Sequence, residues 1–152
     1  MLGQIKAHQG DYQGGVQDLE RAVSLAQENQ FDGIDELQEI IFAVKNNEAV
    51  CLYEQANFAA QQGNIEEAIE PARKAYEFQC SVNHKNSQPA TLGLLGQLLL
   101  AQNKSDEGLK QLQQALDIAQ ELQAQETIDQ LQEMISVFSR EIEDQDIGGE
   151  QL

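Results

Sequence analysis

Apolar residues recur along most of the chain at steps of three and four, which is the spacing of one face of an α-helix. Ile34, Leu37 and Ile41 follow this rule, and the stripe continues beyond them through the next twenty positions. We therefore expect a long helix over 34–62. Asn46–Asn47 is the weak point of this helix, where it could break instead.

Three segments of the chain align with one another without gaps. Each segment carries two small residues of the same type, twelve positions apart, with a turn signal between them. Two antiparallel helices approach closely only where a small residue on one faces a small residue on the other, so each segment predicts a tight helix pair. The three pairs of small residues are Gly3/Gly15, Ala56/Ala68 and Gly96/Gly108.

The third segment reads Leu92-x2-Leu95-Gly96-x2-Leu99 and resembles the tetratricopeptide repeat, whose pattern is W-x2-L-G-x2-Y. The resemblance implies an all-α fold, a TPR-like right-handed α-solenoid of three helix pairs plus a C-terminal capping helix. The second and third segments lie 40 residues apart, like the lengthened repeats of kinesin light chain-type proteins. We expect a repeat domain over 1–143, with repeats at about 1–30, 34–82 and 88–123, a capping helix at 127–143, and an acidic disordered tail at 144–152.

Two local signals refine the second pair. Gly63 suits the left-handed conformation that closes a helix. Asn64 and Glu67 have the spacing of a capping box for the helix that follows.

The charge of the chain limits its partners. It has 9 basic and 26 acidic residues, a net charge of −17, and 41% hydrophobic residues. This acidity disfavours nucleic acid and anionic membrane surfaces, and the apolar runs are too short to cross a bilayer. Residues 1–63, 64–104 and 105–152 carry net charges of −7, 0 and −10, which suits a partner with basic flanks around an apolar centre. Alternatively, the acidity serves only solubility.

The sequence offers little for catalysis. It has two histidines, His8 and His84, and no motif of a nucleotide-binding, hydrolase or metalloprotease site. Cys51 and Cys80 fall within helical stretches without metal-ligand spacing, so we expect buried, free thiols and a cytoplasmic protein. We expect no enzyme, no cofactor and no metal.

The resemblance also implies a concave face lined by the first helix of each pair. A protein or peptide ligand would bind there, which makes the chain an adaptor, scaffold or assembly factor. The alternative is a self-assembling structural protein that forms a homodimer through its uncapped N-terminal repeat. Amide side chains on this face can pair with a peptide backbone, and a tyrosine adds a large contact surface. The positions that map to this face include Gly93 and Leu94, and the expected binding residues are Gln4, His8, Tyr53, Asn57, Gln61, Gln97 and Leu100.

Overall fold

The computed structural model describes residues 12–30 and 32–150. Within these residues it contains α-helices and one short 3₁₀ turn, and no strand, which confirms the predicted all-α fold. The elements are α2 (Tyr12–Glu28), α3 (Ile34–Gln61), α4 (Ile65–Ser81), the 3₁₀ turn η1 (Lys85–Ser87), α5 (Gln88–Ala101), α6 (Ser105–Glu121) and α7 (Gln125–Glu150).

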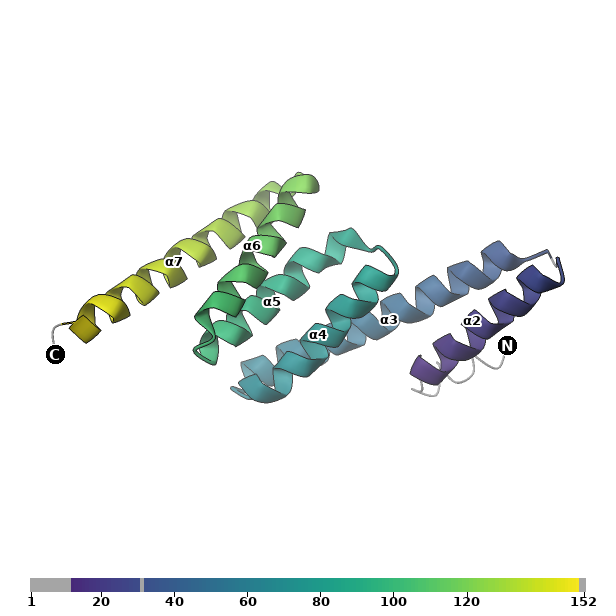
Figure 1. Cartoon of the computed structure of the whole chain (residues 1–152), viewed down its shortest axis with the longest axis horizontal. Helices are drawn as coiled ribbons and strands as arrows, with labels where there is room; N and C mark the ends of the chain where they lie inside the picture. Colours follow the sequence, from purple (N-terminus) through teal and green to yellow (C-terminus); the bar gives the residue numbers. More distant parts are fainter. Residues whose placement is uncertain (1–11, 31, 151–152) are drawn as a thin grey trace.

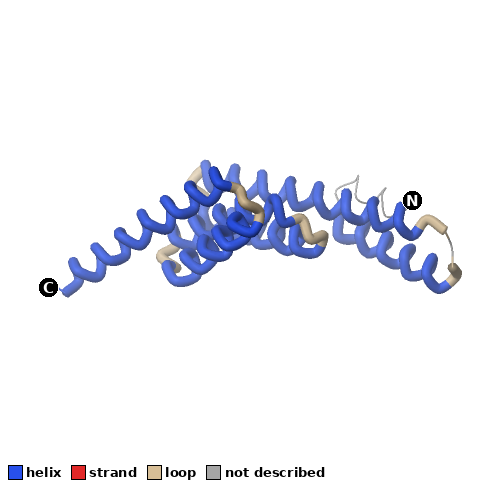
Figure 2. Tube along the Cα trace, turned by 90° about the horizontal axis from the view of Figure 1, so that it is seen from above, coloured by secondary structure: helices blue, strands red, loops and turns tan. Residues whose placement is uncertain are grey.

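The helices form an extended row of antiparallel neighbours (Figures 1 and 2). α3 packs against α4, and α5 packs against α6, so that each forms a helix pair of the predicted kind. Contacts between α4 and α5, and between α6 and α7, join the pairs to one another. The arrangement is the predicted TPR-like solenoid. Gly3 and the rest of the first predicted helix lie outside the described residues.

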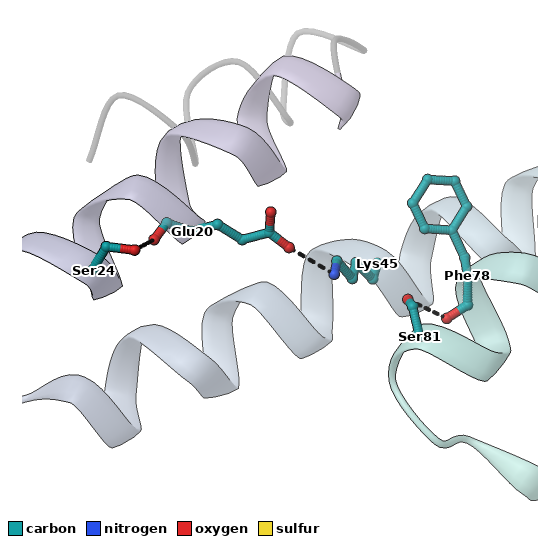
Figure 3. Close-up of polar contacts among 5 residues, drawn as sticks. All are labelled: Glu20, Ser24, Lys45, Phe78 and Ser81. Atoms are coloured by element: carbon teal, nitrogen blue, oxygen red, sulfur yellow. Dashed lines mark hydrogen bonds and ion pairs between the residues drawn. The ribbon is translucent and has the colours of Figure 1, made fainter. Parts of the chain in front are cut away.

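The N-terminal part of the row is attached through α3. This helix is continuous through Asn46–Asn47, so the predicted weak point does not break it. α2 packs on α3 around Val16, Leu19 and Val44, which are buried together. Beside this contact, the Nζ of Lys45 lies 2.9 Å from a carboxylate oxygen of Glu20 (Figure 3).

α5 is the central helix of the row and is apolar on almost every side. It contacts α4 and α6 along its length and touches α3 and α7. From Thr91 to Leu99, Gln97 is the one exposed residue. A helix that is apolar all round must be buried on all sides, and the four surrounding helices bury α5 in this way.

Gly96 of α5 and Gly108 of α6 bring their two helices into close contact. A Cβ atom added to Gly96 would lie 2.8 Å from Cγ of Leu112 and 3.0 Å from the carbonyl oxygen of Gly108. A Cβ atom added to Gly108 would lie 2.6 Å from Cγ of Leu100. These distances leave no room for a side chain, as the sequence pattern predicted. Ala56 and Ala68 occupy the equivalent positions of α3 and α4, and both are fully buried.

The connections after α3, α4, α5 and α6 share one geometry. Each contains a residue with positive φ just past the helix end, and two backbone hydrogen bonds return to the last turn, as in a Schellman motif. Gly63 has φ +79°, which confirms its predicted left-handed conformation. The capping box is wrong, because the N–H of Asn64 already donates to the carbonyl of Ala59 and is not free for Glu67.

Gln123 holds the same left-handed position after α6, with φ +55°. Because a side chain is strained there and glycine is not, Gln123→Gly should raise the free energy of unfolding by about 0.5–1 kcal/mol. Gln120→Gly, three residues earlier and also exposed, should lower it by about 1 kcal/mol, since glycine is unfavourable inside a helix. Urea denaturation of both variants gives the comparison. Equal destabilisation by the two glycines would contradict the motif.

The C-terminal helix is longer than predicted. α7 begins at Gln125 and continues to Glu150, so the residues expected to form a disordered tail are helical as far as that residue. Between 139 and 147 the sequence holds no glycine or proline, and glutamate, glutamine and isoleucine are compatible with a helix. In both views the C-terminal half of α7 extends past the end of α6 (Figures 1 and 2).

Candidate partner-binding face

The structure describes five of the seven predicted binding residues. Gln4 and His8 lie outside the described residues. Tyr53 is half-buried and packs against the core formed by α3, α4 and α5. Asn57 is half-buried and Gln61 is exposed, both in the C-terminal half of α3.

Gln97 and Leu100 come together beside α7. The side-chain amide of Gln97 is exposed and donates to the sulfur of Met134 over 2.7 Å. Leu100 is half-buried, and it fills the space next to Gly108 and packs against the core of α6 and α7. Leu100 therefore serves helix packing as well as the surface.

The exposed edge of these residues opens into a hollow of about 310 Å³ between α5, α6 and α7, which we call the α5–α7 hollow. Its walls combine apolar side chains with amides, a hydroxyl and one carboxylate. The lining residues are Gln97, Leu100, Ala101, Asn103, Ser105, Phe138, Glu141, Ile142 and Gln145.

A second hollow lies along α7, and we call it the α7 hollow. It has a volume of about 370 Å³ and shares Phe138 with the first. Val137 in its wall is 44% exposed, which is high for a valine. The lining residues are Gln130, Glu133, Met134, Val137 and Phe138.

This contribution of α7 was not predicted from the sequence. The helix was expected only to cap the last hydrophobic surface. Leu131 does cap that surface, because it is buried against the core of α5 and α6. The neighbouring face carries Met134 and Phe138, which are only partly buried and form the hollows. Met134 and Phe138 belong to the same apolar stripe as Leu131, and this pattern could have indicated their role.

Two other positions were predicted wrongly. Gly93 and Leu94 were expected on the binding face, but both are buried. Leu94 joins the core with α3 and α4, and a Cβ added to Gly93 would lie 3.5 Å from Leu131. The cause is the central place of α5, because neighbours on both sides cover positions that are open in an outer helix.

The cysteines also differ from expectation. Cys51 and Cys80 are free, as predicted, but both are exposed. Cys51 follows the buried Ala49 by two residues, which is about 200° around a helix, so it points away from the core. The apolar character of cysteine suggested burial. Whether a helical side chain is buried, however, depends on which side of its helix faces the core.

We expect both thiols to react in the folded protein with an aqueous disulfide reagent, at rates within about tenfold of those in the denatured chain. Absorbance of the released thiolate measures the two rates, and Cys51→Ser assigns them. Labelling that begins only after denaturation would show that the thiols are buried.

The pKa shifts lie away from the two hollows. Burial raises the pKa of Tyr76 to about 12, with a further contribution from its hydrogen bond to Cys80, while the amide of Gln114 donates to the hydroxyl and opposes the shift. Burial raises the pKa of Glu48, and the charge of Lys74 acts against it. Both shifts follow from helix packing. Among the described residues, no group of three or more His, Cys, Asp or Glu side chains has an arrangement that could hold a metal.

Length and apolar character decide whether a helix can cross a membrane. In the described part of the chain, none is both long and apolar enough to span a bilayer.

A comparison with protein families identifies a repeat in the N-terminal part of the chain. The family model of the tetratricopeptide repeat matches residues 1–29, which is the first of the three predicted repeats. Among curated proteins, none matches the chain. The lengthened spacing of the later repeats stays a prediction. The chain is thus similar to the tetratricopeptide repeat over residues 1–29, and its later helices form antiparallel pairs in a TPR-like solenoid.

Proposed function

We propose that the chain is an adaptor or assembly factor that binds a segment of a partner protein on the face formed by the first helices of its pairs. Tetratricopeptide repeats generally mediate protein–protein interaction. The observation that carries the proposal is Gln97, the one exposed position of an otherwise buried stretch of α5, at the rim of the α5–α7 hollow.

The proposed contacts divide by chemistry. Asn57, Gln61 and Gln97 each offer an amide that can donate to and accept from a peptide backbone. Tyr53 and Leu100, both half-buried, supply apolar surface that is already held in place by the core. Pre-ordered side chains lose little entropy on binding, so such positions are suited to carry affinity. Gln4 and His8 are proposed to extend this face at the N-terminal end.

The cytoplasm is the proposed compartment. Two unpaired, exposed thiols suit a reducing environment.

The experiment is affinity capture of partners with matched amide-to-alanine variants. Asn57→Ala and Gln97→Ala remove amides from the proposed face, and Gln120→Ala removes an exposed amide from α6, the second helix of its pair. We expect the parent and Gln120→Ala to retain a partner protein that Asn57→Ala and Gln97→Ala do not retain. The melting temperatures of all the variants should match that of the parent.

The opposite pattern, with loss only in Gln120→Ala, would place binding on the other face. If no protein is retained and light scattering gives the mass of a dimer, the self-assembling alternative is supported instead.

A further inference from the structure

The two hollows meet at Phe138, whose side chain lines both of them, and we call them together the Phe138 surface. The surface combines apolar walls from Leu100, Met134 and Val137 with amides from Gln97 and Gln145. We propose, building on the proposed function, that it binds an extended, lysine- or arginine-bearing segment of the partner with apolar side chains at alternating positions.

The charge of α7 argues for a basic segment. This helix carries eight acidic residues and one basic residue, Arg140. Glu133 lines the α7 hollow and Glu141 lines the α5–α7 hollow, and both are exposed. Among the residues that the structure describes, no lysine or arginine lines either hollow. A cationic side chain beside each carboxylate would be attracted, whereas an acidic segment would be repelled from both ends of the surface.

The polar groups argue for an extended backbone. A helical ligand satisfies its own backbone hydrogen bonds, but an extended one needs donors and acceptors from its receptor. The α5–α7 hollow supplies the side-chain amides of Gln97, Asn103 and Gln145 and the hydroxyl of Ser105. Alternate side chains of an extended segment point to the same side, so apolar residues two apart would face the apolar walls together.

The test selects 12-residue peptides from a random display library on the full chain and measures their affinities. The double variant Glu133→Lys/Glu141→Lys replaces both negative charges of the surface by positive charges. Glu28→Lys/Glu77→Lys makes the same change of net charge at exposed positions of α2 and α4 that line neither hollow. Thermal melts of both double variants check the fold.

We expect the selected peptides to carry a net positive charge with apolar residues at alternating positions. The affinity of these peptides should fall at least tenfold in Glu133→Lys/Glu141→Lys and less than threefold in the control. Their association should slow as salt rises from low to physiological concentration, since screening weakens the attraction.

Four results would overturn the inference. The first is selection of neutral or acidic peptides. The second is an equal loss of affinity in both double variants, which would assign the effect to overall charge. The third is binding that Asn57→Ala abolishes and Glu133→Lys/Glu141→Lys leaves unchanged, in which case the proposed function stands and the surface on α7 does not. If no peptide is enriched, both the inference and the binding of peptide segments fail.

Discussion

Gly96→Leu is expected to lower the free energy of unfolding by about 3 kcal/mol, because α5 and α6 must move apart to admit the side chain. Even a Cβ atom at this position would lie 2.8 Å from Cγ of Leu112, which is fully buried. Gly96→Ala should therefore destabilise the protein too. The gain of about 1 kcal/mol in helix propensity opposes the overpacking cost of about 1–3 kcal/mol but does not exceed it.

Gly93→Ala is the matched control, because it lies in the same helix one turn earlier. A Cβ atom there would meet Leu131 at 3.5 Å, an ordinary contact distance. The variant should gain about 1 kcal/mol from helix propensity alone. Urea denaturation of the three variants gives the comparison. If Gly96→Leu were as stable as the parent, or if both alanine variants shifted stability in the same direction, the close contact of α5 with α6 would be disproved.

Asn47→Pro is expected to lower stability by about 3 kcal/mol or more and to separate the melting of the two parts of the row. Proline removes the N–H that bonds one turn back and clashes with the carbonyl there. Asn47 lies in the middle of α3, between the part that packs on α2 and the part that packs on α4 and α5. Since α2 packs mainly on α3, a break at this point removes the coupling between the α2 side of the row and the rest.

Circular dichroism during heating measures this effect, and limited proteolysis locates the part that opens first. Asn47→Ala is the control, and it should keep one transition at a slightly raised melting temperature, because alanine is the better helix former. A proline variant that melts in one transition at the parent temperature would show that α3 does not transmit stability between the two parts.

Much of the local structure could be predicted because it depends on residues close in the sequence. The stripe that begins at Ile34 predicted α3 to within one residue of Gln61. The small residues Gly96 and Gly108, twelve apart with a turn between them, predicted a close contact that the structure confirms. Gly63 predicted the end of its helix, since few other residues adopt its backbone conformation without strain.

The candidate binding surface could be predicted only in part. Gln97 and Leu100 were recognised by their place in the repeat, and they do lie together at the α5–α7 hollow. Phe138 and Glu141, which complete this hollow, come from a helix whose role looked purely structural. The sequence around Phe138 and Glu141 does not indicate that α7 lies beside Gln97.

By itself, the sequence determined the helical class, the ends of most helices and the small residues at the centre of the third pair, because periodicity, backbone strain and side-chain volume act locally. Tertiary structure decided which helix is central, and this placed Gly93 and Leu94 in the interior and left Cys51 outside. It also decided that α7 leaves two hollows around Phe138. Burial depends on how many neighbours surround a helix, and that number follows from contacts between residues far apart in the chain.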